Sequence, residues 1–137
     1  MLINSSLLKE HGYINGKWVG SDAKSRFDIK NAYTNEVIST LPDMGKKETD
    51  EAINAANEAW PDWRSRTAKE RAFILKKWFD LIMENQEDLA ILMTAEQGKP
   101  LAEARGEVGY GASFIEWFAE EGKRTYGDII PTPANDR

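Results

Sequence analysis

Residues 101–124 read LAEARGEVGYGASFIEWFAEEGKR, a stretch in which apolar residues recur at steps of three and four. This spacing is typical of an α-helix. One apolar face consists of Leu101, Ala104, Val108, Gly111, Ile115, Phe118 and Gly122, and a second consists of Tyr110, Phe114 and Trp117. A helix that is apolar on two sides needs two packing partners. The stretch therefore predicts a mainly α-helical fold in which other elements pack against both sides of this helix.

Two further helices are predicted upstream of this stretch. The first runs from Lys46 to Ala59 and is alanine-rich, with acidic residues in its first turn, as a helix N-terminus prefers. Pro61 is expected to stop it, because proline has no N–H to donate within a helix. The second opens with Thr67 and Glu70, a capping box in which each residue satisfies the free backbone amide of the other.

A shorter helix is predicted between the capping-box helix and residue 101. Asn85 is expected to cap its N-terminus, with Leu89 and Met93 facing inward. It ends at Gly98-Lys99-Pro100, which combines a glycine C-cap with a proline that cannot continue the helix.

The first third of the chain predicts short strands. Asn15-Gly16 lies between two β-prone runs, a strong hairpin signal. Phe27 and Ile29 alternate with charged residues, and the β-prone run 37–41 ends at Pro42. We predict a β meander over residues 12–42, helices over 46–126 and an extended tail over 127–137, all within a single partial domain. Because the strands precede the helices instead of alternating with them, no cofactor-binding parallel sheet is expected in this segment.

Composition excludes several classes of function. The 137 residues include no cysteine and carry a net charge of −5. A cysteine nucleophile, a disulfide framework and a thiolate zinc site are therefore excluded, and an acidic chain is a poor candidate for nucleic-acid binding. The single histidine, His11, is expected to be solvated. The longest apolar run is too short to span a membrane, and residues 1–9 do not resemble a signal peptide, so we expect a cytoplasmic protein.

Two glycine motifs invite nucleotide-binding interpretations that the surrounding residues oppose. Gly98-Lys99 resembles part of a P-loop, but Pro100 stands where Ser or Thr is required. The Gly106–Gly111 segment lies inside a helix instead of following a strand. Each interior glycine costs a helix about 1 kcal/mol relative to alanine. This cost indicates close approach by a neighbouring backbone, which we favour, or the wall of a cavity.

Acidic residues on the same helix raise the alternative of paired catalytic carboxylates. Glu116 and Glu120 are four residues apart, and Glu121 follows. Lys123 and Arg124 are placed to compensate Glu120 and Glu121 from the next turn. A solvated charged face is the favoured interpretation.

Two strings carry a resemblance to a known family. Residues 92–104, LMTAEQGKPLAEA, and residues 112–124, ASFIEWFAEEGKR, strongly resemble bacterial succinate-semialdehyde dehydrogenases of the aldehyde dehydrogenase superfamily. Ile14–Trp18 and Thr67–Ala72 are weaker echoes of the wider superfamily. Ala32, Ala95 and Gly111 depart from the pattern of the family, which leaves the exact substrate open.

The resemblance implies that the chain is the N-terminal, helix-rich part of an α/β coenzyme-binding domain, without its parallel sheet. Members of the family oxidise an aldehyde, here succinate semialdehyde to succinate, with NAD or NADP and a catalytic cysteine. Those elements would follow Arg137, so no catalytic and no cofactor-binding residue is assigned to this chain, and the chain alone is expected to be inactive.

The resemblance also suggests two sites on this segment. Gly106, Tyr110 and Phe114 would face the tunnel through which the aldehyde enters, although simple helix packing is the alternative. Some members bind a monovalent cation nearby, and the backbone carbonyl of Ile29 and the carboxylate of Glu96 are the candidate ligands, since hard cations take oxygen ligands.

Two functional hypotheses remain open at this point. The chain is either a truncated enzyme or a non-catalytic helical module that docks on full-length dehydrogenase subunits or on another partner. In both cases the second apolar face of the helix at 101–124 predicts self-association.

Overall fold

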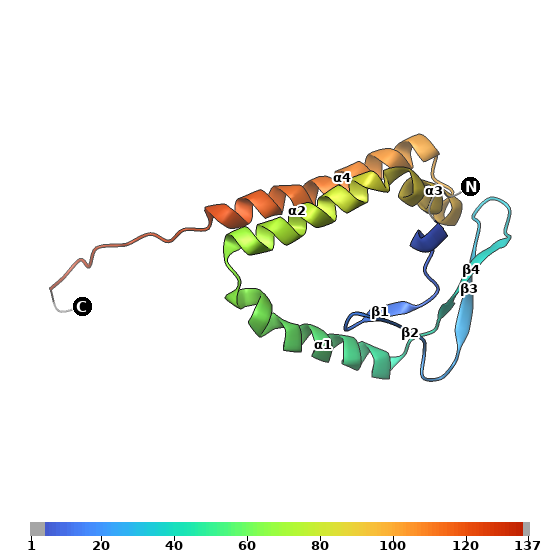
Figure 1. Cartoon of the computed structure of the whole chain (residues 1–137), viewed down its shortest axis with the longest axis horizontal. Helices are drawn as coiled ribbons and strands as arrows, with labels where there is room; N and C mark the ends of the chain where they lie inside the picture. The colour runs from blue at the N-terminus through green and yellow to red at the C-terminus, as the bar shows by residue number, and fades with distance from the viewer. Residues whose placement is uncertain (1–4, 136–137) are drawn as a thin grey trace.

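The computed structural model describes residues 5–135 and is mainly α-helical (Figure 1). A short 3-10 helix at Ser5–Leu7 precedes two hairpins, and four helices follow. The elements in chain order are β1 (Gly12–Ile14), β2 (Lys17–Val19), β3 (Arg26–Lys30), β4 (Val37–Pro42), α1 (Lys46–Ser65), α2 (Ala68–Glu84), α3 (Gln86–Gln97) and α4 (Leu101–Glu121). Strands come first and helices follow, as the sequence predicts.

The strands form two separate antiparallel ribbons, which corrects the predicted single meander. β1 pairs with β2 through the register Tyr13↔Trp18, and β3 pairs with β4 through Phe27↔Leu41. Asn15 and Gly16 both have positive φ angles (49° and 77°), the backbone of the tight hairpin turn that Asn-Gly favours.

The loop between β2 and β3 is bonded to α1. The backbone N–H of Asp22 donates to the Glu48 carboxylate at 2.5 Å, and Lys47 pairs with the Asp22 side chain at 2.8 Å. These contacts tie the loop to the first turn of α1 and carry the chain away from β2. They join residues 26 positions apart, so no local pattern in the sequence predicts them.

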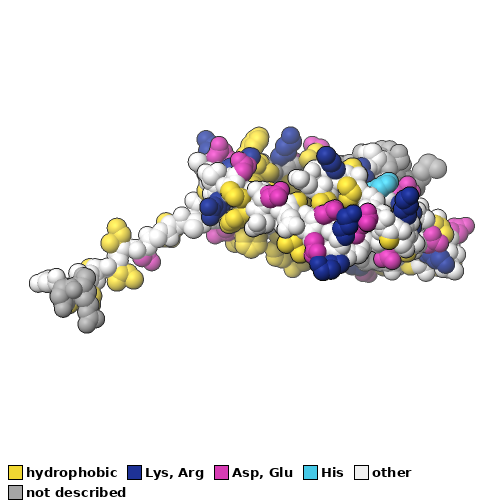
Figure 2. Space-filling model, turned by 90° about the horizontal axis from the view of Figure 1, so that it is seen from below, with side chains coloured by type: hydrophobic (Ala, Val, Ile, Leu, Met, Phe, Trp, Pro, Cys, Tyr) yellow, Lys and Arg dark blue, Asp and Glu magenta, His cyan; other side chains and the backbone are white. Residues whose placement is uncertain are grey.

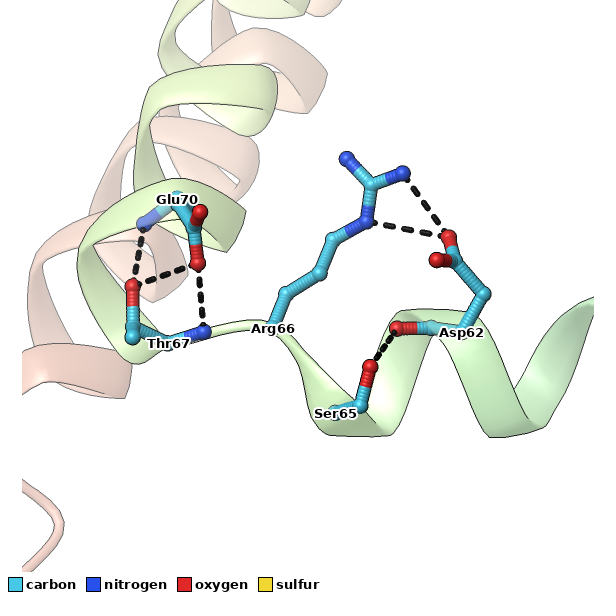
Figure 3. Close-up of polar contacts among 5 residues, drawn as sticks. All are labelled: Asp62, Ser65, Arg66, Thr67 and Glu70. Atoms are coloured by element: carbon cyan, nitrogen blue, oxygen red, sulfur yellow. Dashed lines mark hydrogen bonds and ion pairs between the residues drawn. The ribbon is translucent and has the colours of Figure 1, made fainter.

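Helix α1 continues through Pro61 to Ser65, so the prediction that Pro61 ends the helix is wrong. Proline removes one N–H, but its fixed φ angle is compatible with helical backbone. Polar contacts then complete the final turn. Ser65 Oγ donates to the Asp62 carbonyl at 2.8 Å, and the Arg66 guanidinium contacts the Asp62 carboxylate at 2.8 and 3.1 Å (Figure 3).

The predicted capping box opens α2. The Glu70 N–H donates to Thr67 Oγ1 at 3.2 Å, and the Thr67 N–H donates to the Glu70 carboxylate at 2.8 Å (Figure 3). Asn85 occupies the N-cap position of α3, as predicted, but its side chain makes no capping hydrogen bond, because its amide donates backward to the carbonyl of Leu81. Gly98 ends α3 in the left-handed conformation, with φ 76°, as predicted.

The core lies where α4 packs on α2 and α3, and small side chains form it. The buried apolar residues are Ala72, Ala90, Ala104, Val108, Ala112 and Ala119. Among the residues that the structure describes, no large side chain is fully buried. Core burial typically contributes about 1.5–3 kcal/mol per large apolar side chain, so an alanine core contributes little. Ile82, Leu89, Met93 and Leu101, which are partly buried, pack around this small core.

Beyond α4, a 3-10 turn at Gly122–Arg124 leads into an extended tail. Residues 125–135 contain no helix and no strand, and the tail stands clear of the helices (Figure 1, red). Ile129 and Ile130 are almost fully exposed. The unpaired backbone of this segment is therefore available for pairing with another strand.

Candidate functional site

The two apolar faces predicted for α4 have different environments. Ala104 and Val108 of the first face are buried against α2 and α3, whereas Phe118, placed on the same face by its spacing, is exposed at the end of the helix. Tyr110 and Phe114 of the second face are exposed by 66% and 47% of their surfaces. The edge of one ring meets the face of the other in a T-shaped pair, with centroids 4.9 Å apart and planes at 84°. Helices α2 and α3 cover one side of α4, and no element among the described residues covers the aromatic side.

An open apolar groove of about 590 Å³ borders the exposed side of α4. Tyr110, Gly111 and Phe114 line it from α4, Ile82 from α2, and Leu89 and Met93 from α3. Gly106 is not among the lining residues. The structure thus brings two of the three predicted tunnel residues together in one groove.

Interior glycines of α4 lack the packing contacts that we favoured as their explanation. A Cβ atom at Gly106 or Gly111 would meet nothing within 4 Å, whereas at Gly109 it would meet the side-chain amide of Gln86 at 3.4 Å. Within the described residues, packing therefore accounts for Gly109 alone. The surface around Gly106 and Gly111 is open to a ligand or to another segment of protein.

Charged contacts hold α3 against α4 and fix the walls of the groove. Arg105 makes two hydrogen bonds to the Glu87 carboxylate, at 2.6 and 2.7 Å, and the Gln86 amide donates to the Arg105 carbonyl at 3.0 Å. These bonds from the guanidinium lower the pKa of Glu87 and raise that of Arg105. The sequence analysis missed this pair, because its members are 18 residues apart and no helical spacing relates them.

The predicted cation ligands belong to elements that lie close together. The Ala32 N–H, just after β3, donates to the Ala95 carbonyl of α3 at 3.0 Å. Ile29 is half-buried and Glu96 is exposed. Among residues 5–135, no cluster of three or more His, Cys, Asp or Glu side chains is placed to hold a metal ion. The Ile29–Glu96 cation site stays a prediction.

A strand, a loop and a helix occur in succession once among the described residues, at β4 and α1. There the Glu48 carboxylate accepts hydrogen bonds from the N–H groups of Gly45, at 2.9 Å, and Asp22. The carboxylate occupies the place at the helix N-terminus where a phosphate would bind. These residues do not fit the pyrophosphate of a dinucleotide.

The other candidates weighed from the sequence are surface features. His11 is exposed, as expected. Lys123 pairs with Glu120 at 2.7 Å and Arg124 pairs with Glu121, which confirms that these acidic residues belong to a charge-compensated face. In the described part of the chain, no helix is long and apolar enough to cross a membrane.

A model of the aldehyde dehydrogenase family matches residues 18–137. The chain belongs to this family. It is 55% identical over 136 residues to the glutarate-semialdehyde dehydrogenase of Pseudomonas putida and 54% identical to the NADP(+) succinate-semialdehyde dehydrogenase of Escherichia coli. Both alignments cover 99% of this chain and the N-terminal 28% of the relative.

Solved structures of aldehyde dehydrogenases have the same backbone over this segment. The crystal structure of an Escherichia coli NADP-dependent enzyme superimposes with a TM-score of 0.96 at 54% identity, covering 99% of this chain and 28% of that one. The resemblance based on residues 92–104 and 112–124 is confirmed. The chain spans little more than a quarter of the length of the aldehyde dehydrogenases that it matches.

Proposed function

We propose that this chain forms the N-terminal part of an NAD(P)-dependent aldehyde dehydrogenase that oxidises succinate semialdehyde, or a similarly short semialdehyde, to the acid. The observation that supports this most directly is the identity of 54–55% over 136 residues to two semialdehyde dehydrogenases. Both of their substrates carry a carboxylate at the end opposite the aldehyde. NAD or NADP, when bound to the complete enzyme, supplies the hydride acceptor.

This segment contributes a wall of the substrate path and no reacting group. An aldehyde oxidation through a covalent thioester needs a nucleophile, a base and a cofactor. The chain contains no cysteine, and its described residues do not fit a dinucleotide. The catalytic and cofactor-binding groups would come from other parts of the enzyme, and the chain alone is inactive.

Gly106, Tyr110 and Phe114 are the residues of this wall. Tyr110 and Phe114 offer apolar surface that binds the carbon chain of the aldehyde and keeps water away from it. Gly106 has no side chain that would narrow the path beside them, because a Cβ atom there would project into open space.

A monovalent cation bound by the Ile29 carbonyl and the Glu96 carboxylate is part of the same proposal. The hydrogen bond from Ala32 to Ala95, which keeps the ends of β3 and α3 together, supports it. The cation would act as a structural tie between these elements.

A chimera tests the proposed function. The 137 residues replace the matching segment of the Escherichia coli dehydrogenase, and oxidation of succinate semialdehyde is followed by the formation of NADPH. We expect kcat/KM within about tenfold of the unaltered enzyme, since a tenfold change corresponds to about 1.4 kcal/mol. A folded chimera of normal oligomeric state that oxidises neither succinate nor glutarate semialdehyde would contradict the proposal.

The second candidate, a non-catalytic module that docks on dehydrogenase subunits, is favoured by one observation. The aromatic side chains of α4 are exposed to solvent, and exposed apolar patches of this kind usually mark a surface that binds another protein. The same chimera separates the candidates, because a module without catalytic competence would leave the chimera inactive towards every aldehyde.

A further inference from the structure

Glu107 brings a negative charge to the apolar groove on α4. It lines the groove together with Tyr110 and Phe114, and the other lining residues in the described part of the chain are uncharged. Two carboxylates repel each other more strongly beside apolar surface than in open water, because the local dielectric constant is lower. An unpaired Glu107 would therefore oppose the entry of an anionic substrate into this groove.

Lys99 neutralises this carboxylate from the loop between α3 and α4. Its ammonium group pairs with Glu107, which lies eight residues further along the chain. The Lys99 side chain is 29% exposed, and no basic side chain in the other ion pairs of the described residues is less exposed. Partial burial reduces the screening of the pair by water, so the charge of Lys99 acts mainly on Glu107.

The conformation of the loop holds Lys99 in place. Gly98 has a φ angle of 76°, and its N–H donates to the Thr94 carbonyl at 2.8 Å. A Cβ atom at Gly98 would lie 3.2 Å from the Cβ of Ala32, so a side chain there would be both strained and crowded. Pro100 follows as the N-cap of α4. The Gly98-Lys99-Pro100 motif thus presents its lysine to a carboxylate instead of to a phosphate.

The Lys99–Glu107 pair differs in position from ordinary surface ion pairs of this chain. Figure 2 shows basic and acidic side chains interspersed over one face of the molecule. The Lys46–Asp50 and Lys76–Asp80 pairs each join neighbouring turns of one helix, and none of their members lines the groove. The Lys99–Glu107 pair joins a loop to α4, and one of its members lines the groove.

We propose that Lys99 is a specificity-determining residue, which allows aldehydes with a remote carboxylate into the groove by neutralising Glu107. The inference rests on the proposed function, in which Tyr110 and Phe114 border the path of the aldehyde. Succinate and glutarate semialdehyde are anions, whereas an aldehyde with a methyl group in place of the carboxylate is neutral. The charge of Glu107 repels only the anions. Loss of Lys99 should therefore change the choice between the two kinds of aldehyde.

Kinetics of the chimera with succinate semialdehyde and with butanal test this role, because butanal has the same chain length and no carboxylate. In Lys99→Met, the ratio of kcat/KM for succinate semialdehyde over butanal should fall by roughly tenfold at low salt, and by less at high salt, which screens the charge of Glu107. In Glu107→Gln the ratio should not fall. In the double variant it should return to within about twofold of the original value, because the two changes are coupled.

A purely structural role for the pair predicts a different result. Loss of packing would lower kcat/KM for both aldehydes alike, and removal of Glu107 would not restore it. Lys76→Met breaks the ion pair with Asp80 on α2 and is the matched control, which should leave the ratio unchanged. An unchanged ratio in Lys99→Met, or a ratio that stays low in the double variant, would overturn the proposal.

Failure of this inference is distinct from failure of the proposed function. An active chimera whose ratio does not respond to Lys99→Met refutes the role of Lys99 and leaves the function standing. A folded chimera that oxidises no aldehyde refutes the function, and calorimetric binding of the acids succinate and butanoate then measures the role of Lys99. The ratio of the two affinities should fall in Lys99→Met and recover in the double variant, and a constant ratio would overturn the proposal.

Discussion

Tyr110 combines exposure with a fixed orientation. Its ring packs against Phe114 at 4.9 Å, yet two-thirds of its surface is free. Truncation of a core aromatic residue typically costs about 3–5 kcal/mol, because a cavity remains. An exposed ring leaves no cavity, so the side chain at this position is open to serve recognition.

Tyr110→Ala in the chimera should therefore change specificity more than stability. We expect a loss of stability no greater than about 1.5 kcal/mol, the scale of one aromatic pair. The ratio of kcat/KM for succinate over glutarate semialdehyde should shift, because the apolar wall beside the carbon chain becomes smaller. Phe73→Ala, an exposed aromatic residue of α2, is the matched control and should leave the ratio unchanged. An unchanged ratio together with a loss of several kcal/mol would show that Tyr110 is core.

Protonation of the Glu48 carboxylate at low pH should reduce the stability of the folded chain. Hydrogen bonds from backbone N–H groups, that of Asp22 first, lower its pKa below the ordinary value of 4.5. A carboxyl group with a lowered pKa stabilises the folded state above the ordinary pKa and loses that contribution as pH falls through the folded value. We expect the resonance of the Gly45 amide, which donates to the Glu48 carboxylate, to move as pH falls below 4.5, and to move much less in Glu48→Gln. A midpoint above the ordinary value would contradict this role.

At the scale of the elements, local signals predicted the structure and distant contacts corrected it. Asn15-Gly16, the Thr67–Glu70 box and the terminating Gly98 act within a few residues, so a sequence pattern reveals them. The two ribbons are separate, and the loop between them is bonded to α1 through Asp22 and Glu48, a long-range contact without a local signature. Tyr110 and Phe114 were found as candidates through helical spacing and family resemblance. The opposite wall of their groove comes from α2 and α3, and contacts between α3 and α4 such as the Arg105–Glu87 pair join residues 18 positions apart.

The capping box sets the stability of the first turn of α2. Thr67→Ala removes the acceptor for the Glu70 N–H and should cost about 1 kcal/mol, the typical value for such a cap. Hydrogen exchange of the Glu70 amide in the chimera should accelerate by about fivefold, which corresponds to that energy. Thr67→Ser keeps the hydroxyl and should exchange at nearly the original rate. Equal acceleration in both variants would contradict the capping role.

The whole molecule has a small core and a large apolar surface. Most of the fully buried apolar residues are alanines, whereas Tyr110, Phe114, Trp117 and Phe118 of α4 lie exposed. A helix layer of this kind is stable when a further layer covers it. The two semialdehyde dehydrogenases that the chain matches are more than three times as long as this chain.

The isolated chain should bind neither NAD nor NADP. The N-terminus of α1 is occupied by Glu48, and the described residues provide no other succession of strand, loop and helix to receive the phosphates. Titration calorimetry should give no heat of binding at micromolar to millimolar cofactor, with the chimera as the positive control. Micromolar affinity of the isolated chain would contradict this expectation.

The association state of the isolated chain tests most directly whether it is one layer of a larger enzyme. Sedimentation equilibrium over a wide range of concentrations measures it. We expect the average mass to rise with concentration above the 15.5 kDa of the monomer, because the exposed aromatic residues of α4 (Tyr110, Phe114, Trp117 and Phe118) pack between copies. In Trp117→Lys the mass should fall back towards 15.5 kDa, because a charge among these residues opposes apolar contact. A constant 15.5 kDa for the unsubstituted chain, with a sharp unfolding transition and no binding of apolar dye, would contradict the account, since the helices would then close on themselves.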